Sequence, residues 1–297
     1  MSTSSHYVGL DVSLKETSIC VIDEADVTVW RGRSLSTPDA IIAAVKAHAP
    51  NAARIGLESG QLAVWLYHEL KVGGLPVICV DARHAKAALS LKANKTDAND
   101  ALGLARIMRV GWYREVSVKA IDIYAVRALL VARAQVVSQI TMLKNCVRGI
   151  LKTFGLVMPK GLRSQFAERV RQAVEDQPLL EPIVEPLLTV LQTTREQLAV
   201  YNRAVMKQAR ESKVAGQLMS VPGVGTVVAL AYISAVGDPA RFKRSSSVAA
   251  YFGMTALAER LGSKKATMAV ARKLAVLLHR MWRNGAQFDW GQQTASA

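Results

Sequence analysis

The first 35 residues contain three apolar-rich runs that predict β-strands. The runs cover residues 7–12, 17–22 and 27–35, and short polar segments separate them. Runs of this length, bounded by polar turn residues, are typical of strands. Because the connections are short, we expect the three strands to form an antiparallel meander.

The pattern then alternates between helix and strand. Thr37 and Pro38 suit the N-cap and first position of a helix that ends near residue 48. Further elements follow in the order strand, helix, strand, helix, at residues 54–57, 61–72, 76–81 and 96–110. The complete order predicts a mixed five-stranded sheet with helices packed on it.

The middle of the chain has helical periodicity. A mostly apolar stripe predicts a long helix over residues 122–154, and Pro159–Gly161 breaks it. A shorter helix over 164–175 and a second long helix ending near residue 213 follow. The two long helices suit an antiparallel hairpin or coiled-coil arm, while ordinary core helices remain the alternative.

The last 85 residues suggest a small helical domain. A glycine turn at 222–225 precedes an apolar helix over 226–235, and a basic helix covers 264–283. With the length of 297 residues, these patterns predict three parts, with boundaries 1–115, 116–212 and 213–297.

The net charge of +15 comes from 38 basic and 23 acidic side chains. The three predicted parts carry +1, +6 and +8, so the first is nearly neutral and the other two are cationic. A cationic surface of this size predicts a polyanionic partner, with nucleic acid favoured over an acidic membrane surface.

Several protein classes are excluded by composition. The three cysteines are scattered without CxxC spacing, which disfavours a zinc ribbon or a disulfide framework and fits a reducing cytoplasm. The longest apolar stretch, residues 227–236, is too short to span a bilayer, and the N-terminus lacks a signal-peptide pattern. We therefore expect a cytoplasmic protein without a membrane partner.

Four acidic residues of the neutral part suggest a metal site. Asp11 and Glu58 each follow an apolar strand, and Asp97 and Asp100 share one face near the start of a predicted helix. A dense carboxylate cluster repels itself unless a cation binds, and an all-oxygen ligand set favours Mg²⁺ or Mn²⁺. Simpler interpretations stay open: Asp97 as a first-turn acid with Thr96 as the cap, and Glu58 as a solvent-facing strand end.

The cationic parts contain candidate DNA contacts. The turn with Gly223 and Gly225 resembles a helix-hairpin-helix, in which the glycines allow the backbone to approach a phosphate at the start of a helix. The turn alone favours a plain connection between helices, and the +8 charge of this part favours DNA binding. Four basic residues of the last helix are further candidates, for which a solvated face is the alternative: Lys264, Lys265, Arg272 and Lys273. Lys243 and Arg244, earlier in this part, are also candidate phosphate contacts.

Taken together, these motifs resemble insertion-sequence transposases with a DEDD carboxylate set. The matching segments in the first part are YVGLDVS (7–13), GLES (56–59) and NKTDANDA (94–101). Those in the last part are VPGVG (221–225), AAYFG (249–253) and ARKLA (271–275). The resemblance covers nearly the whole chain, but the middle part matches the family only in its helical character and not through a specific motif.

The resemblance implies an α/β RNase H-like (RuvC-like) N-terminal domain, a long helical hairpin or coiled coil, and a small α C-terminal domain. It implies that Asp11, Glu58, Asp97 and Asp100 are the catalytic metal ligands. It also implies DNA as substrate, a homo-oligomer assembled through the long helices and, for some members, a structured guide RNA.

One segment departs from the family pattern. Family members carry a serine nucleophile in a block that follows the AAYFG-like motif. In this sequence, residue 255 is followed almost directly by a segment similar to the family's later tail. A few dozen residues are therefore missing between them. Ser245, Ser246 and Ser247 precede the motif and suit a helix start, and Ser263 has the wrong flanking pattern, so no nucleophile is assigned.

Three functions follow from these observations. The first is a metal-dependent DNA transposase or recombinase, inactive in strand exchange if the serine block is essential. The second is a nucleic-acid-binding remnant without catalysis. The third is an actin-like metabolite kinase, suggested by Gly9-Leu10-Asp11, but it leaves the basic charge unexplained and lacks a second phosphate loop.

Overall fold

The computed structural model describes residues 5–289 except 84, 86–96, 160, 162–163 and 255–261, and for 97–98 and 262–266 it describes the backbone alone. Contacts divide the chain into two compact units, Met1–Val118 and Lys119–Ala297. The division into three parts expected from the sequence stays a prediction.

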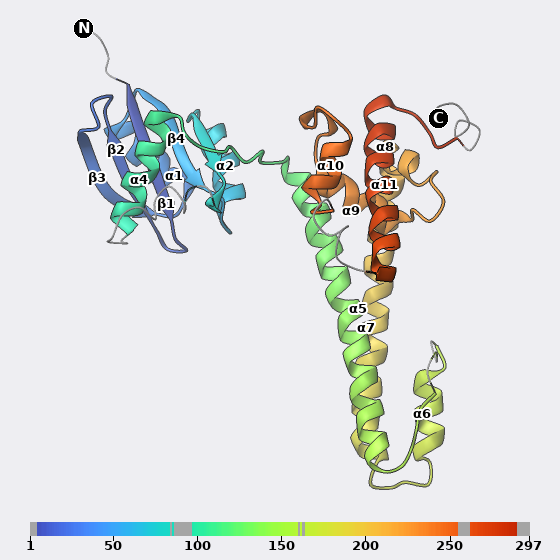
Figure 1. The fold of residues 1–297 in the computed structure, drawn as a ribbon. Helices are drawn as coiled ribbons and strands as arrows, with labels where there is room; N and C mark the ends of the chain where they lie inside the picture. Colours follow the sequence, from blue (N-terminus) through green and yellow to red (C-terminus); the bar gives the residue numbers. More distant parts are fainter. Residues whose placement is uncertain are drawn as a thin grey trace. The chain divides into compact units, whose positions relative to one another are not determined.

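The first unit contains a five-stranded mixed sheet (Figure 1). The strands are β1 His6–Val12, β2 Glu16–Ile22, β3 Thr28–Leu35, β4 Ala52–Glu58 and β5 Val77–Val80. Their spatial order is β3-β2-β1-β4-β5. The β1–β2 and β2–β3 pairs are antiparallel, and the β1–β4 and β4–β5 pairs are parallel.

Helices cover both faces of this sheet. Helices α1 (Pro38–His48) and α2 (Ala63–Val72) pack with Val8, Leu10 and Leu57 in the main core of the unit. Helix α4 (Asp97–Val110) packs against β1, β2 and β4 on the opposite face. An antiparallel meander extended by two parallel strands, with helices on both faces, is the RNase H-like arrangement. The expected fold class is therefore confirmed.

Two glycines allow α4 to lie directly on the sheet. Gly9 of β1 and Gly56 of β4 are register partners. A Cβ at Gly9 would lie 2.5 Å from the Ala105 nitrogen and would also overlap the Ala101 carbonyl oxygen, and one at Gly56 would lie 2.8 Å from Met108 Cγ. Only glycine fits at such a close approach between a helix and a strand.

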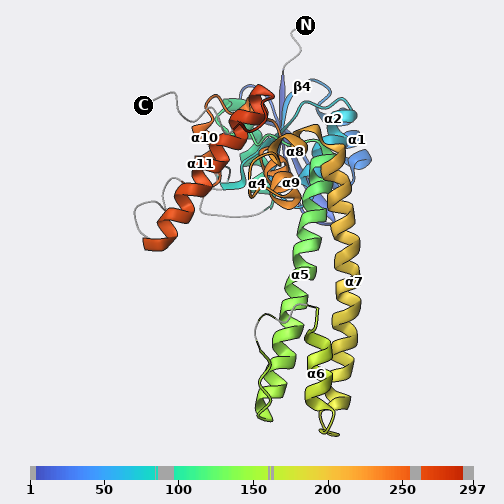
Figure 2. The same ribbon diagram turned by 90° about the vertical axis from the view of Figure 1, so that its right-hand side faces the viewer.

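The second unit begins with a long helical hairpin. Helices α5 (Ile121–Thr153) and α7 (Glu181–Glu211) lie side by side, and the shorter α6 (Phe166–Val174) packs near their connection (Figure 2). Val147, Leu151, Val170 and Leu188 are buried in one shared core. The two helices therefore form the hairpin alternative predicted from the sequence.

The rest of the second unit is a cluster of shorter helices. They are α8 Lys213–Leu218, α9 Thr226–Val236, the 3₁₀ turn η1 Pro239–Arg241, α10 Ser246–Tyr251 and α11 Gly262–Asn284. The sequence patterns did not predict α8. It is separated from α7 at Ser212, whose hydroxyl accepts a hydrogen bond from the Ala215 N–H and caps the new helix. None of the described helices is long and apolar enough to cross a membrane.

Candidate metal-dependent active site

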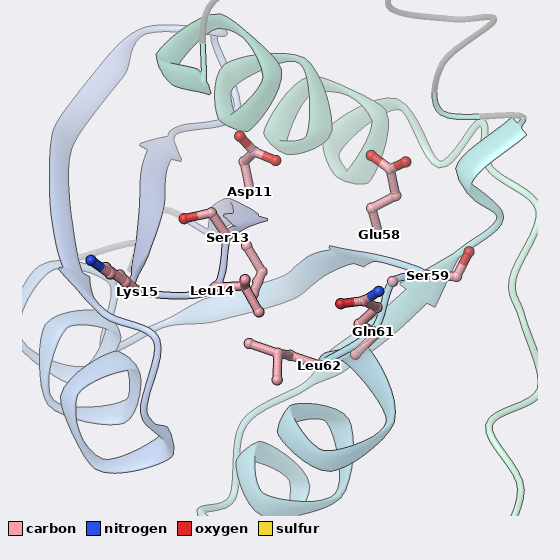
Figure 3. Close-up of a pocket in the computed structure, with 11 residues that line it drawn as sticks. Asp11, Ser13, Leu14, Lys15, Glu58, Ser59, Gln61 and Leu62 are labelled. Carbon is pink, nitrogen blue, oxygen red and sulfur yellow. The ribbon is translucent and has the colours of Figure 1, made fainter. Parts of the chain in front are cut away.

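The structure places Asp11 and Glu58 next to each other at the carboxyl edge of the sheet. Leu10 of β1 pairs with Leu57 of β4, so the two acids are the next residues on adjacent parallel strands. Both line the same pocket, which has a volume of about 710 Å³. Figure 3 shows both carboxylates on the same side of the pocket, directed toward helix α4.

The direction of α4 follows from hydrogen bonds at its C-terminal end. Arg54, near the start of β4, donates to the Met108 carbonyl oxygen at 2.9 Å. Arg106 binds Asp26 at 2.9 Å, in the turn between β2 and β3, and Arg109 donates to the Glu24 carbonyl oxygen at 3.1 Å. Since these partners lie at the amino ends of β1 and β4, the helix runs antiparallel to them and begins at their carboxyl ends.

Asp97 and Asp100 therefore belong to the turn of α4 nearest the Asp11–Glu58 edge. Ala101 and Leu104 are buried against the sheet, and positions 97 and 100 precede them by one helical turn on the same face. Asp100 is half-buried, whereas the Asp97 side chain and Thr96 lie outside the described residues.

The donor chemistry fits a hard divalent cation. Asp11 and Glu58 offer carboxylate oxygens on one side of one pocket, which suits Mg²⁺ or Mn²⁺. Among the described side chains, no group of three His, Cys, Asp or Glu forms a potential metal site, and Asp97 is not among those side chains. The four-carboxylate set thus stays a prediction, supported by the shared pocket and the direction of α4.

The nearby thiols are not suited to this chemistry. Burial, together with the charge of Glu115, raises the pKa of the Cys79 thiol on β5 to about 11. Burial also raises the pKa of Cys20 on β2. Neither thiol is among the described residues that line the pocket of Asp11 and Glu58, so the candidate ligands there are oxygen donors.

Two of the predicted DNA contacts, Gly223 and Gly225, lie in the turn between α8 and α9. Gly223 has a φ of +84°, which favours glycine, and Gly225 is the N-cap of α9. Val221 and Val224 are buried beside them and fix the turn to the core. The structure thus shows a tight turn between two helices, and both the helix-hairpin-helix assignment and the contact with DNA stay predictions.

The predicted basic contacts are exposed where their side chains are described. Lys243 and Arg244 lie between η1 and α10, and Arg272 and Lys273 lie on α11. Lys264 and Lys265 belong to α11, but their side chains lie outside the described residues. The structure therefore leaves the DNA assignment of all six residues as a prediction.

Ser245 shows a contact that sequence patterns did not reveal. It is the N-cap position of α10, as expected for a helix start, but its side chain makes no cap hydrogen bond. Instead, its Oγ lies 3.0 Å from Nδ1 of the buried His279, and Nε2 of that ring lies 2.9 Å from the Pro239 carbonyl oxygen. The ring thus connects both ends of the segment between η1 and α10.

Comparison with protein families gives two matches along the chain. A family model described as a transposase, of the DEDD type of IS110 elements, matches residues 8–155. A second, described as the transposase IS116/IS110/IS902 family, matches residues 215–294. The first match contains Asp11, Glu58, Asp97 and Asp100, and the second contains the glycine turn and α11.

Curated relatives give the same result. The chain is 26% identical over 289 residues to the transposase for insertion sequence element IS1111A of Coxiella burnetii, covering 94% of this chain and 76% of that protein. It is 27% identical over 202 residues to a probable family 20 transposase of Pseudomonas aeruginosa, covering 66% and 60%. Among solved structures, Thermus thermophilus RuvC is similar at 11% identity and a TM-score of 0.29, over 37% of this chain and 99% of that chain.

Proposed function

The chain belongs to the DEDD transposase family of IS110-type insertion sequences, and from this membership we propose that it binds DNA and cleaves it with a divalent metal held by Asp11, Glu58, Asp97 and Asp100. The observation that carries the proposal is the position of Asp11 and Glu58. They are neighbours on parallel strands, in one pocket, at the edge where α4 begins.

The roles of the residues follow from this placement. The carboxylates of Asp11 and Glu58 bind the metal from the sheet, and the 97/100 pair completes the site from the helix. When bound, Mg²⁺ or Mn²⁺ supplies a nucleophilic oxygen at neutral pH and stabilises charge on a phosphodiester. Gly9 and Gly56 keep the helix close enough to the sheet for both pairs of acids to act on one phosphate.

Substitution of the two sheet carboxylates tests this proposal. Asp11→Asn and Glu58→Gln remove charge with little change in volume, and we expect each to reduce Mg²⁺-dependent DNA cleavage by about 100-fold or more. The measurement is cleavage of a labelled DNA duplex by the full chain. Glu69→Gln is a matched control, because Glu69 is an exposed acid on α2.

Equal cleavage by Glu58→Gln and Glu69→Gln would refute the metal-site proposal. A chain that binds DNA but shows no metal-dependent cleavage in any form would support the second function, a DNA-binding remnant. That alternative is favoured by the segment near residue 255, where the family's serine block is absent from the sequence.

Two partners implied by the resemblance belong to the same proposal. We propose self-association through the long helices, for which Val131 and Met142 of α5 are exposed apolar side chains, 69% and 65% accessible. A structured RNA is the second proposed partner, and the excess of basic residues in the second unit is compatible with it.

A further inference from the structure

The pocket that holds Asp11 and Glu58 has a second wall with a different character. This wall is the turn formed by residues 13–15, between β1 and β2, and it contributes Ser13, Leu14 and Lys15 to the lining. Lys15 is the one cationic side chain among the described residues that line the pocket. Figure 3 shows this turn across the pocket from Glu58 and Gln61.

Buried hydroxyl groups hold this turn in place. Ser36 donates its backbone N–H to the Lys15 carbonyl oxygen at 2.9 Å and its hydroxyl to the Ser13 carbonyl oxygen at 2.8 Å. Because that hydroxyl has a single proton, it accepts the hydrogen bond from Thr17, at 2.8 Å. Thr17 is fully buried and Ser36 is 7% exposed. We call the two bonds from Ser36 to the turn the Ser36 latch.

The turn between β1 and β2 does not need the Ser36 latch in order to close. The hairpin already closes through the Ser13 N–H and hydroxyl, which donate to the Glu16 carbonyl oxygen at 3.1 and 2.6 Å. The bonds from Ser36 add a connection to the segment before α1 and fix the direction of the turn. Burying two hydroxyl groups is unfavourable unless both are hydrogen-bonded, so the network also resists rearrangement.

The charge of Lys15 is available to a ligand. Its side chain is exposed, and no carboxylate of the described residues lies within ion-pair distance of it. The neighbouring Glu16 instead lies 3.5 Å from Arg33. A cation on a rigid turn binds an anion at a lower entropic cost than one on a mobile turn. An anion beside a carboxylate-lined metal pocket is most simply a phosphate of the nucleic-acid backbone.

We propose that Lys15 binds a DNA backbone phosphate adjacent to the one at the carboxylates, and that Ser36 is the positioning residue that holds Lys15 there. This inference rests on the proposed function and extends it, since it assigns a substrate contact to a residue outside the carboxylate set. The contact is with the backbone and so does not depend on base sequence.

The test measures binding of a mixed-sequence DNA duplex by the full chain at several salt concentrations. The buffer contains Ca²⁺, a divalent cation that also prefers oxygen ligands. The logarithm of the binding constant falls linearly with the logarithm of the salt concentration. We expect Lys15→Gln to make this negative slope shallower by about 1, as for the loss of one phosphate contact. Lys15→Arg should retain the wild-type slope, because the charge remains.

A matched control separates this contact from general loss of charge. Lys46 is an exposed lysine on α1, which packs on the face of the sheet opposite α4, and Lys46→Gln makes the same change in charge. We expect this variant to keep the wild-type slope. If Lys15→Gln and Lys46→Gln change the slope equally, the proposed contact is wrong.

The latch is tested by a second pair of variants. Ser36→Ala removes the bond from the hydroxyl to the Ser13 carbonyl and should weaken DNA binding several-fold at low salt. Thr17→Val is nearly isosteric and leaves both Ser36 bonds to the turn, so its binding should stay close to wild type. Equal DNA affinity of Ser36→Ala and wild type would overturn the positioning role.

These results are independent of the cleavage assay. If Asp11→Asn cleaves DNA as wild type does, the proposed metal site fails, whatever the salt slope of Lys15→Gln. If Asp11→Asn is inactive but Lys15→Gln keeps the wild-type slope, the metal site stands and the Lys15 contact is refuted.

Discussion

At the scale of single residues, Lys119 places a charge against the end of helix α9. Its ammonium group donates to the carbonyl oxygens of Ser234, at 2.6 Å, and Ala235. Burial is the main cause that lowers its pKa from 10.5 to about 8, and the charges of Arg127 and Arg241 act in the same direction. The bonds satisfy carbonyl groups that the helix leaves open, while the burial disfavours the charge.

This gives a dependence of stability on pH. The folded chain loses the Lys119 proton near pH 8 and the unfolded chain near pH 10.5, so between these values the unfolded state binds more protons. The free energy of unfolding should therefore gain a contribution that increases from pH 8 to 10.5 and is absent below pH 8. The measurement is denaturant unfolding of wild type and Lys119→Met across this range.

The difference between the two proteins isolates Lys119 from other groups that titrate in the same range. A constant difference from pH 7 to 10.5 would show that the pKa of Lys119 is not lowered by folding.

Single residues also differ in how far their roles could be predicted from the sequence. Asp11 was identifiable because a carboxylate directly after an apolar strand is conspicuous. The Ser36 latch and the Ser245–His279 contact were not identifiable, because they join residues 23 and 34 positions apart and hydroxyl groups follow no periodic pattern. Lys15 lies within three residues of the YVGLDVS motif, and its position in the chain was the available signal.

At the scale of elements, the position of α4 depends on the absence of side chains beneath it. Gly9 and Gly56 let the helix lie against β1 and β4, and the bonds from Arg54 and Arg106 set its direction. The strands and most helices were predicted from apolar periodicity, which is local. The β1–β4 register and the contact of α4 were not, because both depend on pairings between distant segments.

Gly9→Ala should therefore displace α4. Its Cβ would lie 2.5 Å from the Ala105 nitrogen and 2.9 Å from Leu104 Cβ, so the helix backbone must move away from the sheet to make room for it. We expect a loss of about 1–3 kcal/mol of stability and a large loss of metal-dependent cleavage. The measurements are thermal unfolding and the cleavage assay.

Gly216→Ala is the control for this prediction. Gly216 lies in α8, and a Cβ there would meet nothing within 4 Å, so this change should be neutral or stabilise the chain by about 0.5–1 kcal/mol. Wild-type stability and activity for Gly9→Ala would contradict the close packing of α4.

At the scale of the whole molecule, the two units have separate cores. Apolar clusters around Leu10 and Leu104 belong to the first unit, and those around Leu151 and Leu230 belong to the second. The net charge is also divided, because the second unit holds most of the basic excess. The chain thus combines a nearly neutral candidate cleavage unit with a cationic unit suited to binding.

Separate cores should produce two unfolding transitions rather than one. In scanning calorimetry of the full chain, we expect Gly9→Ala to lower the midpoint of one transition and leave the other within experimental error. A single cooperative transition, shifted as a whole by this substitution, would show that the two units unfold together.

The place of α4 in the chain also has a consequence during translation. It is the last helix of the first unit to be synthesised, and it delivers Asp97 and Asp100 after β1 and β4 have already supplied Asp11 and Glu58. A nascent polypeptide that ends before α4 leaves the surface over Gly9 and Gly56 open and has only half of the acids. The four candidate metal ligands are therefore present together only after α4 has been synthesised, when the sheet strands that carry Asp11 and Glu58 are already complete.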